Sequence, residues 1–158
     1  MEAGGPTVSA LGEEAALWLE DLEGKWERGG RPFERRLLDA ALEALQELPG
    51  TQGEQVLVHQ DLHADNVLSA EREPCLAIDP KPLSGEREFG IAAIVRGGEL
   101  GNDERSLRGR LDRLTIDLGL DRERARGWAL AQTLAWAWTE DVPHPHHVEV
   151  ARWLLQAE

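Results

Sequence analysis

The stretch of residues 56–82 constrains the fold most, because two short apolar runs in it both lead into polar side chains. The runs, Val56–Val58 and Cys75–Ile78, have the length and composition of buried β-strands. The polar side chains that follow them are His59, Asp61, His63, Asp65, Asn66 and Asp79. An antiparallel hairpin of the two runs would bring these polar groups to one end of a small sheet.

Such a cluster predicts a bound cation. Carboxylates such as Asp61 and Asp79 repel each other at short range unless a cation or a proton lies between them. A hard divalent cation takes oxygen ligands, and phosphate-bound Mg²⁺ is the commonest case. An alternative treats the alternating His59, Asp61, His63 and Asp65 as the zinc cluster of a hydrolase. That alternative requires a continuous strand, whereas residues 64–66 are typical of a turn.

The spacing of these residues resembles a known family. Asn66 follows Asp61 by five residues, which gives His-x-Asp-x-x-x-x-Asn, and Asp79 follows Asn66 by thirteen. This pattern resembles the catalytic loop and metal-binding Asp of the protein-kinase-like fold. Together with Ile-Asp-Pro-Lys-Pro at 78–82, it resembles the aminoglycoside phosphotransferase superfamily, in the streptomycin 6-phosphotransferase and hydroxyurea kinase branch. The resemblance extends from about Trp18 to the C-terminus.

The resemblance implies an antibiotic-resistance kinase that uses ATP and Mg²⁺ to phosphorylate a hydroxyl of a small molecule such as an aminoglycoside. It implies that Asp61 orients the acceptor hydroxyl and that His59 braces the loop. Asn66 and Asp79 would hold Mg²⁺ at the ATP phosphates, and Lys81 would offset the carboxylate charge.

Two further carboxylates are candidates for binding the acceptor. Related aminoglycoside kinases hold the cationic acceptor with acidic residues near the C-terminus, and Glu140 and Asp141 are such residues here. The alternative is a solvated helix end, where an anion gains nothing from the helix dipole.

The expected fold is α+β and mainly helical, a kinase-like C-terminal lobe with a small antiparallel hairpin that carries the site. Residues 1–12 read as a loose lead-in and residues 13–158 as the lobe. Apolar periodicity and capping residues predict helices over about 13–28, 34–48, 86–96, 103–118, 121–139 and 148–156. The residues ahead of His59 contain no Gly-rich loop and no strand Lys, so the N-terminal nucleotide lobe is expected to be absent.

The expected absence of the nucleotide lobe leaves a second function open. In this alternative the chain is a non-catalytic remnant of a kinase lobe that binds a metal, a small molecule or a partner lobe. A missing lobe would also expose an apolar face and favour self-association. Gly90 stands where the resembled family usually has an Asp that braces the catalytic loop. Because this Asp is absent, the rigidity of the loop that carries Asp61 is in question.

Composition narrows the partners and the compartment. The net charge of −13 argues against nucleic acid and is compatible with a cationic small molecule. No apolar run has transmembrane length, and residues 1–12 lack the pattern of a secretory signal. The single cysteine, Cys75, fits a reducing cytoplasm, and its apolar neighbours predict that it is buried.

Overall fold

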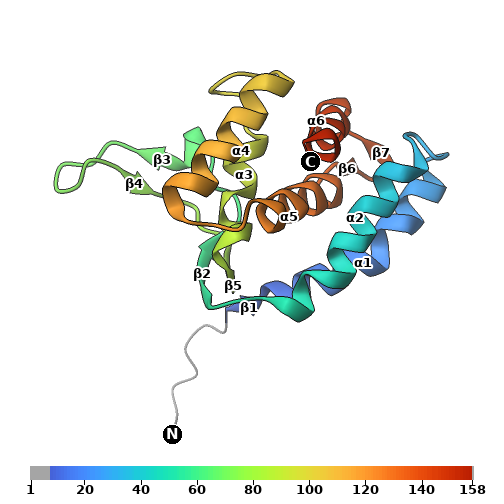
Figure 1. Cartoon of the computed structure of the whole chain (residues 1–158), viewed down its shortest axis with the longest axis horizontal. Coiled ribbons are helices and arrows are strands. Elements are labelled where there is room, and N and C mark those ends of the chain that lie inside the picture. The colour runs from blue at the N-terminus through green and yellow to red at the C-terminus, as the bar shows by residue number, and fades with distance from the viewer. Residues whose placement is uncertain (1–7, 158) are drawn as a thin grey trace, which may run out of the picture.

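The computed structural model describes residues 8–157, which fold into packed helices with three small sheets at their edges (Figure 1). The α-helices are α1 (Leu11–Arg28), α2 (Arg35–Glu47), α3 (Ala92–Arg96), α4 (Glu104–Leu118), α5 (Arg122–Ala135) and α6 (Pro145–Gln156). The strands are β1 (Ser9–Ala10), β2 (Gln55–His59), β3 (Val67–Leu68), β4 (Leu76–Ala77), β5 (Pro82–Glu86), β6 (Trp138–Thr139) and β7 (Val142–Pro143). Short 3₁₀ turns are η1 (Pro49–Thr51), η2 (Ala64–Asn66) and η3 (Arg87–Ile91). The prediction of a mainly helical α+β fold is therefore confirmed.

The strand pairing differs from the predicted hairpin. β2 pairs antiparallel with β5, from Gln55 opposite Glu86 to His59 opposite Pro82. The apolar run at 75–78 instead contributes β4, which pairs with β3 immediately after the polar loop. The prediction was wrong because residues 67–68 are a nearer partner for this run, and only a short loop has to close. The hairpin of β3 and β4 projects from the helical body (Figure 1).

Helix α5 lies at the centre of the core, with α2, α3 and α6 packed around it. Its Trp128 is fully buried and meets the ring of Phe89 edge to face, with centroids 5.5 Å apart. Small residues line its other faces, and Ala125, Ala129 and Ala131 are all fully buried. Small side chains at these positions leave room for the neighbouring helices.

Helix ends follow the capping residues in the middle of the chain. Asp103 and Asp121 accept hydrogen bonds from the backbone N–H groups three residues on, and they begin α4 and α5. Gly119 ends α4 in the left-handed conformation, with φ of 63°. All three of these predicted boundaries are confirmed.

The C-terminal boundaries were predicted less well. Helix α5 ends at Ala135 rather than near 139, because Trp138 and Thr139 pair with β7. Helix α6 begins at Pro145, whose fixed φ suits the first helical turn, so His146 and His147 are helical residues rather than loop residues.

Two other expectations need correction. Cys75 is exposed, since it lies beside the two-residue strand β4 and not in a buried strand. Of the predicted loose lead-in, residues 1–7 lie outside the described part of the chain. Residues 9–10 pair in parallel with β5, and Leu11 already begins α1 and is fully buried.

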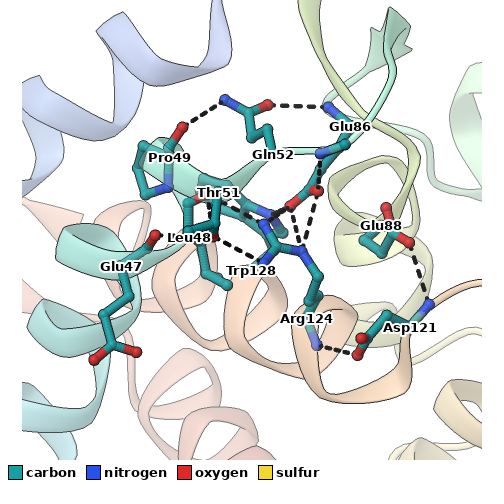
Figure 2. A network of polar contacts seen from close by, with 11 residues as sticks. Glu47, Leu48, Pro49, Thr51, Gln52, Glu86, Glu88, Asp121, Arg124 and Trp128 are labelled. Carbon is teal, nitrogen blue, oxygen red and sulfur yellow. Dashed lines mark hydrogen bonds and ion pairs between the residues drawn. The ribbon is translucent and has the colours of Figure 1, made fainter.

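A buried polar network joins the site-bearing sheet to the helical core (Figure 2). Glu86, at the end of β5, is 2% exposed and accepts hydrogen bonds from both the Nε and Nη2 atoms of Arg124. Trp128 Nε1 and the backbone N–H of Gly53 also donate to its carboxylate. Arg124 further donates to the Leu48 carbonyl at 3.2 Å. The network fixes β5, and through it β2, against α5.

Candidate active site

The loop after β2 is held in place by His59. The Nδ1 atom of His59 accepts the backbone N–H of Asp61 at 3.1 Å, so the ring proton lies on Nε2. That Nε2–H donates to the carbonyl of Ile78 at 2.9 Å. One neutral imidazole thus joins the Asp61 loop to the residue that precedes Asp79. The bracing contact that the resemblance implied for His59 is present.

Asn66 joins the same two segments and leaves one oxygen free. Its Nδ2 group donates to the Asp61 carbonyl at 2.8 Å and to His63 Nε2 at 3.1 Å. The backbone carbonyl of Asn66 accepts the backbone N–H of Ile78 at 2.8 Å. The residue is only 8% exposed, and no group among residues 8–157 donates to its Oδ1 atom. An amide oxygen that is fixed in orientation and free of hydrogen bonds fits a hard cation such as Mg²⁺.

Asp79 follows directly in a strained conformation. Its φ is 48°, which is uncommon for a residue other than glycine, and its side chain is exposed. Both backbone polar groups of Ile78 are engaged by Asn66 and His59, which fixes the preceding peptide. Such strain persists only where the surroundings hold it, and it is concentrated at functional sites. The structure therefore brings the ends of the Asp61, Asn66 and Asp79 segments together, as the sequence predicted.

Asp61 forms an ion pair but keeps one free oxygen. Lys81 Nζ donates to Asp61 Oδ2 at 2.7 Å, and the Asp61 side chain is 16% exposed. This hydrogen bond raises the pKa of Lys81, and the charges of Asp61 and Asp79 raise it further. Asp61 Oδ1 lies 3.8 Å from His63 Nε2, a nitrogen that already accepts from Asn66. Oδ1 is thus available to accept a hydrogen bond from another hydroxyl.

Asp61, His63 and Lys81 border an open pocket of about 420 Å³. Its lining residues are Asp61, His63, Lys81, Ala93, Arg96, Gly97, Gly98, Trp136, His146 and His147. The Trp136 ring centroid lies 5.7 Å from Lys81 Nζ and 5.3 Å from the Arg96 guanidinium carbon. Burial lowers the pKa of His147 to about 4, and the nearby Arg96 adds to this effect.

Three residues that line this pocket, and Gln132 behind them, were not predicted from the sequence. Gln132 on α5 is fully buried, donates to the Gln60 carbonyl at 2.8 Å, and accepts from Arg96 Nη1 at 3.0 Å. It thereby holds the backbone just before Asp61. The missed pocket residues are Arg96, Trp136 and His147. A glutamine within the apolar, alanine-rich stretch of α5 was the one signal in the sequence.

Gly90 does not leave the loop unsupported. A Cβ atom at this position would lie 3.6 Å from Val58 Cγ1, which is ordinary contact, so β2 lies directly beside Gly90. The loop carbonyl that precedes Asp61 is held by Gln132 instead. The loop is therefore anchored from α5 in this chain.

Glu140 and Asp141, which the sequence marked as acceptor-binding candidates, are not among the residues that line this pocket. Both stand in the turn between β6 and β7, where Glu140 has φ of 56°. Asp141 Oδ1 accepts from Arg28 Nε at 3.1 Å, which joins this turn to α1. Neither residue lines the pocket beside Asp61.

The zinc-hydrolase alternative fails on geometry. Both ring nitrogens of His59 are engaged in hydrogen bonds, and the Asp65 side chain is 95% exposed. Across residues 8–157, no three His, Cys, Asp or Glu side chains converge as metal ligands would.

Across the same residues, no helix combines the length and apolarity needed to cross a membrane.

A loop carboxylate beside a fixed amide oxygen and a second carboxylate is the arrangement expected of a small-molecule kinase. The family described as "Aminoglycoside/hydroxyurea antibiotic resistance kinase" matches residues 13–142, and the chain belongs to this family.

Curated relatives agree with this assignment. The chain is 43% identical to a streptomycin 6-kinase of Streptomyces griseus over 134 residues, which cover 82% of this chain and 43% of that protein. It is 45% identical to a hydroxyurea phosphotransferase of Kitasatospora aureofaciens over 131 residues, which cover 80% of this chain and 36% of that protein. The matched region thus spans less than half the length of either relative. No solved structure matches the chain significantly.

Proposed function

We propose that residues 13–158 act as the C-terminal lobe of an ATP- and Mg²⁺-dependent phosphotransferase that phosphorylates a hydroxyl of a small molecule. The relatives named above, a streptomycin kinase and a hydroxyurea phosphotransferase, support this reaction class. The observation that carries the proposal is the pair of unengaged oxygens, Asp61 Oδ1 and Asn66 Oδ1, on a loop pinned by His59. ATP as the donor and a single cysteine fit a cytoplasmic location.

In this proposal Asp61 Oδ1 accepts the hydrogen bond of the acceptor hydroxyl and orients its oxygen for attack. Lys81 donates to the other carboxylate oxygen, which favours this orientation of the carboxylate. Asn66 and Asp79 would hold Mg²⁺, which when bound neutralises the charge of the ATP phosphates. Phosphoryl transfer depends mainly on such positioning and electrostatics, and the His59 and Gln132 contacts supply the rigidity that it needs.

The protein segment that covers the nucleotide phosphates would be contributed from outside residues 8–157. Four apolar side chains on the strands next to the site are exposed: Leu57, Val67, Leu68 and Leu76, at 72%, 39%, 50% and 54%. Apolar side chains on such a surface favour contact with another protein surface. We place the partner lobe, or a second copy of the chain, against these strands.

Calorimetric titration of the 158-residue chain with ATP tests the proposal directly. We expect binding only when Mg²⁺ is present, and its loss in Asp79→Asn. The control is Asp65→Asn, which removes an exposed carboxylate of the same loop. ATP binding that needs no Mg²⁺, or that survives in Asp79→Asn, would contradict the assigned metal site.

A fusion tests the reaction itself. Residues 13–158 would replace the matched part of the streptomycin 6-kinase, and phosphorylation of streptomycin and of hydroxyurea would be followed with labelled ATP. We expect turnover of at least one of the two compounds. Turnover of neither, by a fusion that is folded and binds ATP, would overturn the proposed function.

A further inference from the structure

We propose that Arg96 forms a phosphate-binding subsite in the pocket beside Asp61, where it holds the phosphoryl group of the phosphorylated acceptor. The identity of this ligand rests on the proposed function, whereas the presence of an anion site rests only on the geometry of the pocket. The known motif residues do not include Arg96, which lies at the end of α3.

Arg96 is a cation without a partner anion. Its side chain is partly buried, and among residues 8–157 no carboxylate forms an ion pair with it. A guanidinium has five N–H donors, and the structure engages one of them, at Gln132 Oε1. Burial lowers the pKa of Arg96 and the charge of Asp61 opposes this shift, yet an arginine stays protonated at physiological pH. A desolvated charge with free donors is costly unless an anion binds it.

Two neighbours hold the guanidinium in a fixed orientation. Gln132 is fully buried and fixes Nη1 at 3.0 Å, and the Trp136 ring lies against the group at 5.3 Å. A fixed planar guanidinium can present paired N–H groups to two oxygens of a phosphate. Gln132 also holds the Gln60 carbonyl, so the position of Arg96 is coupled to the loop that carries Asp61.

The charge of the pocket favours an anion at this place. Its lining residues include two permanent cations, Lys81 and Arg96, and a single carboxylate, Asp61, whose ion pair is with Lys81. His147 is neutral near pH 7, because burial lowers its pKa to about 4. The chain as a whole carries a net charge of −13 and repels phosphate elsewhere. A phosphate is therefore expected to concentrate in this pocket.

Titration of the full chain with inorganic phosphate and with methyl phosphate tests the inference. The readout is the ¹⁵N-labelled indole N–H signal of Trp136, assigned with Trp136→Phe. We expect both anions to shift this signal, and Arg96→Gln to weaken binding at least tenfold. Arg105→Gln, an exposed arginine on α4 with the same change of charge, should stay within twofold of the wild type.

Each outcome decides a part of the inference. Absence of phosphate binding, or unchanged affinity in Arg96→Gln, would overturn the subsite. Binding of inorganic phosphate without methyl phosphate would overturn its assignment to a phosphorylated acceptor and make free phosphate the ligand. If Arg96→Gln does not fold, Gln132→Glu replaces it, because a carboxylate beside Arg96 should compete with phosphate and weaken binding at least tenfold. Phosphate binding by a chain that fails the ATP and fusion tests would leave the subsite standing while the proposed kinase function fell.

Discussion

Two polar clusters in this molecule are built from similar groups and differ in how completely they are satisfied. Around Glu86, both carboxylate oxygens accept from Arg124, and Trp128 adds a further donor (Figure 2). The backbone N–H of Gly53 also donates to this carboxylate. Around Asp61, one carboxylate oxygen accepts from Lys81 and the other is free. A closed network stabilises the fold, whereas an open one retains groups that can bind a substrate.

The backbone shows the same contrast. Glu86 ends a five-residue strand that is paired along its whole length with β2. Asp79 stands alone at positive φ between a two-residue strand and Pro80. Asn66 and His59 fix the peptide before Asp79 through the backbone of Ile78, whereas Glu86 is joined to helix α5 through Arg124. We therefore expect mutations in the first cluster to affect stability and mutations in the second to affect activity.

The largest effect is expected from Asp61→Asn. In the fusion enzyme, the kcat should fall by about 10²–10⁴-fold, because the amide cannot accept the proton of the acceptor hydroxyl. The thermal midpoint should hardly change, because the lost ion pair involves a half-exposed lysine and contributes at most about 1 kcal/mol. Steady-state kinetics and thermal melting measure the two effects. Asp65→Asn is the control. Equal losses of activity in Asp61→Asn and Asp65→Asn would contradict the role proposed for Asp61.

Glu86→Gln should give the opposite result. It leaves the charge of Arg124 in a buried site without its carboxylate, which costs about 3–5 kcal/mol of unfolding free energy. Glu34→Gln is a matched control, because Glu34 pairs with Arg152 while about a third of each side chain is exposed. Its loss should be about 1 kcal/mol or less. Urea unfolding measures the loss of unfolding free energy in both variants. Similar losses would show that the buried Glu86 network stabilises the fold no more than a partly exposed ion pair does.

The smallest effect is expected from pH. Since His147 has a folded pKa of about 4 and an unfolded value near 6.5, the unfolded chain binds the proton first as pH falls. The stability linked to this residue is complete above pH 6.5 and is lost between pH 6.5 and 4. The loss should be about 1 kcal/mol, after allowance for solvent around a half-buried group. His147→Gln should remove this part of the pH dependence of urea unfolding, and His146→Gln should not. A dependence unchanged in His147→Gln would show that another group is responsible.

Much of the scaffold and of the central motif was predictable from local sequence. The apolar stripes of α1, α2 and α4, the caps Asp103 and Asp121, and Gly119 set helices through interactions within a few residues. The pattern of Asp61, Asn66 and Asp79 likewise marked the loop, because few other uses combine these residues at this spacing.

Tertiary structure decided everything that depends on residues distant in sequence. The pairing of β5 with β2, and the hydrogen bond between Arg28 of α1 and Asp141, join segments that are distant in sequence. The pairing of Arg96 with Gln132, and of Glu86 with Arg124, joins positions more than thirty residues apart. Periodicity and motif spacing report local geometry, so the sequence alone marked the loop that carries Asp61 as the candidate site. The packed core determined which side chains surround it.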